Sequence, residues 1–225
     1  MAKTKFILGT VAALFASSMA LADNKVYIEQ AGSSNTVTIT QVGSGNRVGD
    51  SGLGNQSKIT GSNNILSATQ TGAGNILDYT VVGNGNTITK SVTGDTNQIT
   101  FVCGDGTTAC TNVTSTMTVA GNSNTIISTI KGTAITNTLS ITGDSNTVNQ
   151  SITTSNSTSD ITILGDSNTF NSTMSGPSAG LGHSLLAVVT GTSNTHTVNQ
   201  TGSVNTTVAI TTTGNSNTVT VNTGN

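Results

Sequence analysis

Short segments in which every second residue is apolar or carries an amide alternate with short turns along most of the chain. In residues 35–41, the sequence NTVTITQ places Asn, Val, Ile and Gln on one face and three threonines on the other. The same alternation follows in 124–130, 146–152 and 168–174. Period-two segments rich in β-branched residues and bounded by glycine predict β-strands of about six residues.

The turns between these segments contain the string Gly-x-x-Asn at a nearly fixed interval. It begins at positions 32, 52, 72, 94, 121, 143, 165, 191 and 214, with spacings of 20 to 27 residues. A weaker series lies halfway between, at positions 43, 61, 83 and 202. A unit of about 22 residues with two strands and two turns predicts an all-β fold, a two-sheet β-solenoid of about nine coils over residues 23–225. The two longest spacings predict insertions at Gly104–Ala109 and Pro177–Gly182.

Glycine and asparagine are the two residues that all nine turns of the main series keep. Glycine supplies backbone conformations with positive φ, and stacked asparagine amides can bond from coil to coil. The corner glycines are Gly32, Gly52, Gly72, Gly94, Gly121, Gly143, Gly165, Gly191 and Gly214. The asparagines predicted to form one ladder that registers the coils are Asn35, Asn55, Asn75, Asn97, Asn124, Asn146, Asn168, Asn194 and Asn217.

The N-terminal segment differs from the rest of the chain. Lys3 and Lys5 precede an apolar run, and small residues follow up to Ala20-Leu21-Ala22. This order is typical of a secretory signal peptide, so we expect residues 1–22 to be removed and to lie outside the fold. In a secreted chain the close pair Cys103 and Cys110 favours a disulfide across a short loop, with two unpaired thiols as the alternative.

Few charges remain for chemistry or for nucleic-acid binding. Charged residues make up 7% of the chain, which has no basic cluster. The two histidines, His183 and His196, are expected to be structural, and the scattered acids form no catalytic group. Asp95, Asp144 and Asp166 follow corner glycines but lack the nonapeptide period of calcium solenoids, so they are interpreted as turn acceptors. The sequence therefore predicts neither an enzyme nor a cofactor or metal site.

One longer pattern identifies a family. Residues 30–46 read QAGSSNTVTITQVGSGN, which resembles the curlin repeat QxGxxNxxxxxQxGxxN of curli fibre subunits. The glutamines in this pattern or in its half-motif are Gln30, Gln41, Gln70 and Gln200. The resemblance implies a secreted bacterial protein that polymerises into extracellular amyloid fibres of the biofilm matrix, with ladders of inward Gln and Asn.

The resemblance and the repeat together set the expected function. We expect a structural subunit of curli-like fibres that stacks end to end with copies of itself and contributes to biofilm and adhesion. By resemblance, its partners would include a nucleator subunit, outer-membrane export machinery, and host or abiotic surfaces. The expected location is extracellular, on a bacterial surface fibre.

Two alternatives remain at this point, a monomeric secreted adhesin and an ice- or surface-binding protein. Outward pairs such as Thr36/Thr38 and Thr218/Thr220 resemble a flat hydroxyl array. Lys58 and Asp78 stand at positions taken as equivalent, and a lattice-matching face should not carry them.

One residue fits the alternation of inward apolar and amide residues poorly. Lys90 falls inward by parity, and a charge buried without a partner is costly.

Overall fold

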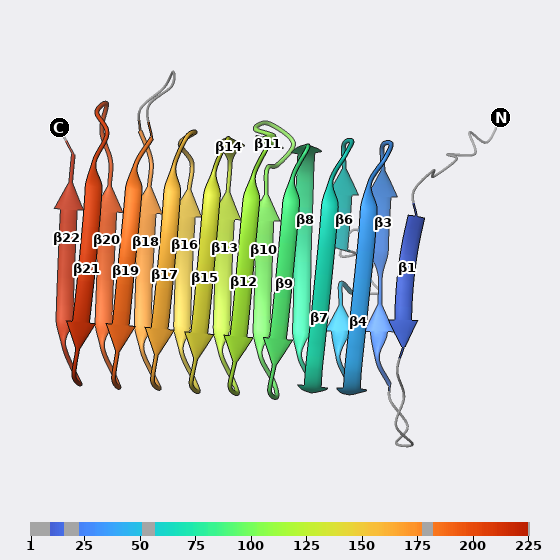
Figure 1. The fold of residues 1–225 in the computed structure, drawn as a ribbon, viewed down its shortest axis with the longest axis horizontal. Helices are drawn as coiled ribbons and strands as arrows, with labels where there is room; N and C mark the ends of the chain where they lie inside the picture. Colours follow the sequence, from blue (N-terminus) through green and yellow to red (C-terminus); the bar gives the residue numbers. More distant parts are fainter. Residues whose placement is uncertain (1–9, 16–22, 51–56, 177–181, 225) are drawn as a thin grey trace.

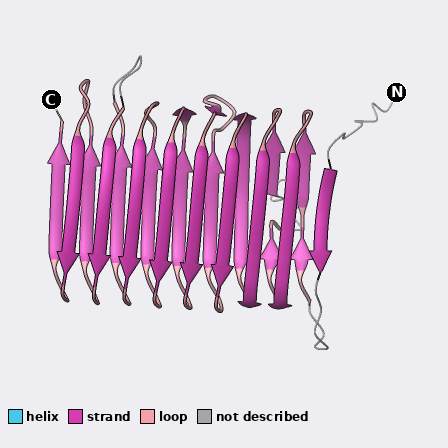
Figure 2. Ribbon diagram, viewed as in Figure 1, coloured by secondary structure: helices cyan, strands magenta, loops and turns pink. Residues whose placement is uncertain are grey.

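The computed structural model describes residues 10–15, 23–50, 57–176 and 182–224, and within them every regular element is a β-strand. The strands lie in two facing layers and stack along one long axis, with the ends of the chain at opposite ends of that axis (Figure 1). Figure 2 shows the same ladder joined by short loops. None of the described residues forms a helix long and apolar enough to cross a membrane.

One layer, sheet A, has nine parallel strands. In spatial order they are β1 (Thr10–Phe15), β4 (Thr36–Ser44), β7 (Ile65–Ala73), β9 (Thr87–Thr93), β12 (Thr114–Ala120), β15 (Thr136–Thr142), β17 (Thr158–Leu164), β19 (Ser184–Thr190) and β21 (Thr207–Thr213).

The other layer, sheet B, has thirteen strands because some of its strand positions are split. Its strands are β2 (Lys25–Val26), β3 (Ile28–Ala31), β5 (Arg47–Val48), β6 (Ser57–Thr60), β8 (Ile76–Asn84), β10 (Gln98–Cys103), β11 (Cys110–Thr111), β13 (Thr125–Ile130), β14 (Gly132–Thr133), β16 (Thr147–Ile152), β18 (Thr169–Met174), β20 (Thr195–Gln200) and β22 (Thr218–Thr223).

The chain alternates between the two sheets, so each coil contributes one strand to each. Pairs such as Thr125↔Thr147 and Thr147↔Thr169 keep a 22-residue register on sheet B. The fold is the predicted two-sheet β-solenoid, with about eight turns of about 23 residues. All strand pairs are parallel, since each coil runs in the same sense as the coil before it.

The interior between the sheets is filled by the inward half of each alternating strand. In β15 the burial pattern is eBeBiBe, with Leu139 and Ile141 buried and the threonines facing outward. Because each sheet has one face on this core and one on solvent, period two is preserved even though the strands are parallel.

One register shift was not visible in the sequence. β5 ends at Val48 and β6 begins at Ser57, yet both pair with β8, with Val48 opposite Leu77 and Lys58 opposite Thr80, so the register between the coils changes from 29 to 22 residues. The first two coils are therefore 29 residues apart, with Gln41 opposite Gln70 and Gly43 opposite Gly72. The Gly-x-x-Asn strings at 32 and 72, which are separated by two 20-residue spacings, therefore do not lie at the same corner of successive coils.

Within residues 1–22, the structure describes Thr10–Phe15 as β1, which pairs with β4 from Thr10↔Thr36 to Phe15↔Gln41. The segment therefore covers one edge of sheet A in the unprocessed chain. Removal of residues 1–22 as a signal peptide stays a prediction.

Candidate functional site

The two kinds of corner carry the most regular polar structure in the molecule. We call the turn from a sheet A strand to the next sheet B strand the A-to-B corner, and the turn back to sheet A the B-to-A corner. Each contains a column of asparagines. The A-to-B asparagine column consists of Asn24, Asn46, Asn75, Asn97, Asn124, Asn146, Asn168, Asn194 and Asn217. The B-to-A asparagine column consists of Asn35, Asn64 and Asn86.

Each asparagine inside a column bonds to the coils on either side of it, and those at the column ends, such as Asn24 and Asn217, bond to one neighbouring coil. Asn146 Oδ1 accepts the backbone N–H of Asn168 at 2.9 Å and the Asn168 side-chain N–H at 3.1 Å. Asn146 Nδ2 donates to Asn124 Oδ1 at 3.1 Å and to the Gly165 carbonyl at 2.8 Å. These amides are buried, and a register slip would leave their donors without acceptors at a cost of about 1–3 kcal/mol for each group.

This arrangement corrects the single ladder expected from the sequence. Asn35 lies in the B-to-A column, where its Oδ1 accepts from the Asn64 amide, and not beneath Asn75. Asn46 takes the place below Asn75. The reason is the register change between β5 and β6, which shifts the early repeats by half a coil. Asn55 and Gly52 lie outside the described residues.

Asn24 begins the A-to-B column and was missed from sequence. Its Oδ1 accepts the Asn46 backbone N–H at 2.9 Å, and its Nδ2 donates to the Gly43 carbonyl at 3.0 Å. It follows Asp23 rather than a Gly-x-x, so the search for Gly-x-x-Asn could not find it. Its 22-residue distance from Asn46 was the available signal.

The corner glycines are required by close approach between coils. Gly143 has φ of 123°, and a Cβ added there would overlap the Gly165 carbonyl oxygen. The same stacking relates Gly72, Gly94, Gly121, Gly143, Gly165, Gly191 and Gly214. Gly32 stacks on Gly61 at the B-to-A corner, so it belongs to the other series, as Asn35 does. The third corner residue is also left-handed, for example Ser145 at φ 58°.

The aspartates in the corners are acceptors on the outer side of each turn. Asp144 Oδ1 accepts the Asn122 backbone N–H at 2.6 Å, and Asp166 Oδ1 accepts that of Asp144 at 2.8 Å. Asn215 does the same for Thr192. Their interpretation as turn acceptors agrees with this geometry, and no group of three or more His, Cys, Asp or Glu within the described ranges could hold a metal ion.

The glutamines of the repeat do not form one continuous ladder. On sheet A, Gln41 Nε2 donates to Gln70 Oε1 at 2.8 Å, and Gln70 donates to the carbonyl oxygens of Arg47 and Asn75 at 3.1 Å. On sheet B, Gln200 donates to the Ser184 carbonyl oxygen at 2.8 Å. Gln30 is buried in β3, and neither of its amide atoms has a partner among the described residues.

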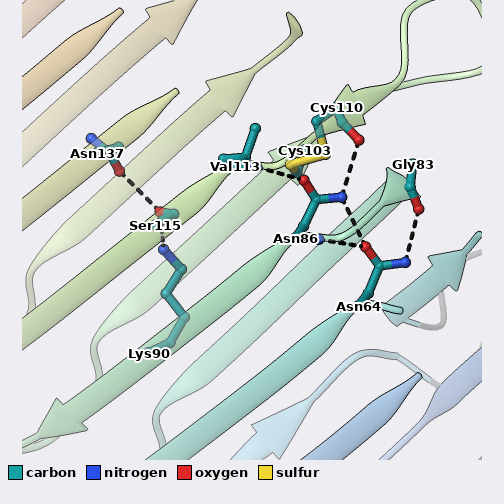
Figure 3. Close-up of a disulfide and its surroundings, with 9 residues drawn as sticks. All are labelled: Asn64, Gly83, Asn86, Lys90, Cys103, Cys110, Val113, Ser115 and Asn137. Carbon is teal, nitrogen blue, oxygen red and sulfur yellow. Dashed lines mark hydrogen bonds between the residues drawn. A yellow bond between two sulfur atoms is a disulfide. The ribbon is translucent and has the colours of Figure 1, made fainter. Parts of the chain in front are cut away.

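The disulfide between Cys103 and Cys110 is present and fully buried. It closes the loop that enters the B-to-A corner, and the Cys110 carbonyl accepts from Asn86 Nδ2 at 3.0 Å (Figure 3). In the same loop Asp105 pairs with Lys131, whose hydrogen bond lowers the pKa of the Asp105 carboxyl. The first predicted insertion is thus a closed loop at the corner.

Lys90 points inward, as parity predicts, and has partners there. Its Nζ donates to Ser115 Oγ at 2.7 Å and lies 3.9 Å from the centre of the Phe101 ring. Ser115 Oγ donates to Asn137 Oδ1 at 3.0 Å, so a chain of polar groups runs through three coils (Figure 3). Burial lowers the pKa of Lys90 from 10.5 to about 7.

Both histidines are structural side chains. His183 is buried, with Nε2 3.0 Å from the Ser175 carbonyl oxygen and Nδ1 2.9 Å from Thr206 Oγ1. His196 stacks on Phe170, and its Nε2 lies 2.8 Å from Thr212 Oγ1. Burial lowers the pKa of His196.

The outer faces of the two sheets differ in chemistry. On sheet A the outward positions are mostly hydroxyl residues, and Asp160 is the one outward charge among its described strands. The outward threonines of β4 to β17 are Thr36, Thr38, Thr40, Thr69, Thr71, Thr87, Thr89, Thr93, Thr114, Thr116, Thr118, Thr136, Thr138, Thr142, Thr158 and Thr162.

The expected break applies to sheet B, where Thr218 and Thr220 lie on β22 in the same sheet as Lys58 and Asp78, and does not apply to sheet A. Lys58 and Asp78 lie on β6 and β8 of sheet B, whereas Thr36 and Thr38 lie on β4 of sheet A. The outward positions of the two sheets were treated as equivalent because a single series of Gly-x-x-Asn turns was followed across the register shift between β5 and β6.

The open strand edges lie at the ends of the solenoid. Among the described strands, β21 pairs only with β19 and β22 only with β20. At the other end, β2 and β3 each have one partner strand, and β4 has a second one only in β1. These edges expose backbone groups that can bond a further parallel strand.

The architecture and its amide columns define the molecule as a parallel two-sheet β-solenoid with a structural repeat. Residues 22–49 match the family model of the curlin associated repeat, so the chain carries the curlin repeat that its QxGxxN pattern predicts. No curated protein and no solved structure matches the chain.

Proposed function

We propose that this chain is a structural subunit of curli-like extracellular fibres and that it assembles by stacking solenoids end to end. The observation that carries the proposal is the set of unpaired edges at the two ends of the described solenoid, on β21 and β22 at one end and on β2 and β3 at the other, where the A-to-B asparagine column also stops. Asn217 Oδ1, at the end of that column, has no donor within the described part of the chain. A second copy would supply such donors.

The curlin repeat at residues 22–49 supports the same function. It contains the first corner of each kind, and such repeats belong to proteins of bacterial surface fibres. Secretion, the export machinery, a nucleator partner and adhesion to surfaces are parts of this proposal. The matched repeat and the solenoid are structural in kind, and a hollow on sheet B lined by Ile127, Asn149 and Asn171, among others, has no titratable lining residue.

A charge placed at an open edge tests the proposal. The side chain of Val221, in β22, faces the core. It is only partly buried because no further described coil covers it. Val221→Lys should stop fibre growth while leaving the monomer folded, since an inward charge at a strand edge blocks pairing. The matched control is Thr220→Lys, which faces outward and should assemble at the wild-type rate.

Assembly would be followed by thioflavin fluorescence and sedimentation, with circular dichroism to show that each monomer is folded. Equal assembly of Val221→Lys and wild type would contradict stacking through this end.

A second function is favoured by the outer face of sheet A. Its threonines repeat about every 4.8 Å across strands and about 6.6 Å along them, with few charges among them. Threonine is stiff about χ1, so such a face presents ordered hydroxyl and methyl groups. Attachment to a regular neutral surface, ice included, is the activity this face would support. Thr116→Lys with Thr138→Lys should abolish ice shaping or surface retention if the face has that role, and leave fibre formation unchanged.

A further inference from the structure

The two sheets differ by one strand when residues 1–22 are absent, and this sets how copies can join. β4 to β21 supply eight strand positions on sheet A. Sheet B has nine, with β2/β3 and β5/β6 counted as one position each and β11 and β14 as corner extensions. The first and last positions, β2/β3 and β22, both belong to sheet B.

Straight stacking of two such molecules leaves one sheet discontinuous. If β4 of the next copy follows β21 directly, its β2/β3 falls on the level already occupied by β22. If β2/β3 of the next copy follows β22, a strand is missing between β21 and the next β4. The missing strand would leave unpaired backbone N–H and C=O groups inside the fibre, which is costly.

We propose that successive copies are related by a half-turn about the solenoid axis, so that each sheet of one copy continues into the other sheet of the next. This inference rests on the proposed end-to-end function and specifies its interface. In this arrangement β21 pairs with β2/β3 of the next copy, and β22 pairs with β4. No strand position is empty and none is filled twice.

The register of the corners brings like residues together at this junction. Gly214 lies seven positions after Thr207, and Gly32 lies seven positions after Lys25. The aligned inward pairs are Val208 with Val26, Ile210 with Ile28, Val219 with Val37, and Val221 with Ile39, the second residue of each pair belonging to the next copy. The core would therefore stay apolar across the joint.

The asparagine columns also continue under a half-turn. The corner GNSN at 214–217 meets GSSN at 32–35 of the next copy. Asn35 can then donate its backbone N–H to Asn217 Oδ1, as Asn217 does to Asn194 Oδ1 at 2.9 Å within the chain. Within the described coils, the B-to-A column consists only of Asn35, Asn64 and Asn86, which lie in the first coils. Across the joint, these three asparagines would continue the A-to-B column of the preceding copy.

Unsatisfied polar atoms at the two ends pair in the same way. Buried atoms without partners among the described residues include both amide atoms of Gln30, Gln41 Oε1 and Thr223 Oγ1. The half-turn places Gln41 beside Thr223 of the preceding copy, and Gln30 beside Thr212, whose hydroxyl pairs with His196. Straight stacking with the gap would place Thr223 beside Gln30 of the next copy instead, and would leave the Gln41 edge unpaired.

β1 occupies the edge of β4 to which β22 of the preceding copy would pair. A chain that keeps residues 1–22 has this edge covered and one more strand on sheet A. Removal of the leader is therefore the step that opens the interface and fixes the half-turn.

Paired cysteines distinguish the two ways of stacking. In the half-turn arrangement Thr211 lies opposite Glu29 of the next copy, whereas in straight stacking Asn222 lies opposite Glu29. Neighbouring strands are about 4.8 Å apart, within disulfide reach. Residues 29 and 211 lie at opposite ends of one molecule, so a bond between them must join two copies (Figure 1).

The secreted, processed double variants would be assembled under reducing conditions and then oxidised. Glu29→Cys with Thr211→Cys should give a ladder of covalent oligomers on denaturing gels, and Glu29→Cys with Asn222→Cys should stay monomeric. The native Cys103–Cys110 disulfide is buried and should not exchange. N-terminal sequencing of the fibres should begin at Asp23.

Cross-linking of the second pair instead of the first, or of neither pair in well-formed fibres, would overturn the half-turn while leaving end-to-end assembly intact. Fibres that retain residues 10–15 would also overturn it. Failure of the wild-type protein to form fibres would instead refute the proposed function itself.

Discussion

At the scale of single residues, the inward asparagine of each corner determines the register between coils. Its amide meets a backbone N–H, a side-chain N–H and a carbonyl on neighbouring coils, and it is buried from water. The outer aspartate meets only one backbone N–H and stays exposed. Asp144 and Asn146 lie two positions apart in the string GDSNT at residues 143–147, yet their hydrogen bonds differ in number and burial.

Replacing the inward asparagines should destabilise the monomer and slow assembly. Asn146→Ala removes the acceptor of the Asn168 backbone N–H and of one side-chain N–H of Asn168, whose other side-chain N–H keeps the Gly191 carbonyl, so the unfolding free energy should fall by about 2–4 kcal/mol. Asp144→Asn keeps an acceptor in place and should stay within about 0.5 kcal/mol of wild type. Urea unfolding of freshly prepared monomer would measure the unfolding free energy of both variants. A larger loss for Asp144→Asn than for Asn146→Ala would contradict the registering role of the asparagine and favour a ligand-binding role for the aspartate.

Lys90 should make the stability of the monomer depend on pH. Its pKa is lowered by burial from 10.5 to about 7, so between these values the unfolded chain binds more protons than the folded one. Stability should therefore rise as pH increases from 7 toward 10 and be independent of this group below pH 7. Lys90→Met should remove that rise and stabilise the protein at pH 7 by about 1–3 kcal/mol.

The comparison requires urea midpoints for wild type and Lys90→Met across this pH range. If the urea midpoints of wild type and Lys90→Met changed with pH in the same way, Lys90 would not be buried in its neutral form.

At the scale of strands and corners, the sequence predicted the strands well because period two and the corner glycines are strict. It could not predict which sheet each early strand joins. β5 and β6 occupy the same strand position beside β8 with different registers, and no local signal in the sequence distinguishes this insertion from a turn. Gly32, Asn35 and the threonine rows were consequently placed in the wrong series, whereas the later 22-residue coils were placed correctly.

A glycine at a stacked corner should be far less tolerant of a side chain than one in a loop. Gly143→Ala introduces a Cβ against the Gly165 carbonyl at φ 123°, and should cost about 2–4 kcal/mol through strain and displacement of the next coil. Gly106→Ala is the matched control, since nothing lies within 4 Å of its added Cβ. Thermal unfolding followed by circular dichroism would compare them, and equal midpoints would contradict close stacking at the corner.

At the scale of the whole molecule, the solenoid has a continuous core and two ends at which that core, both backbone ladders and the amide column stop together. The curlin repeat at residues 22–49 lies at one of these ends. In the proposed assembly, the core, the backbone ladders and the amide column all continue from one subunit into the next. The residues that hold successive coils together would therefore also hold successive subunits together. Eight and a half coils at about 4.8 Å each give a subunit rise of about 41 Å.

Electron cryomicroscopy of the secreted, processed protein tests this account most directly. It predicts unbranched fibres with parallel strands perpendicular to the axis, a strand spacing of about 4.8 Å and a subunit rise of about 41 Å. A processed protein that stays a folded monomer at high concentration over days, or fibres whose subunits do not stack through β21 and β22, would contradict it.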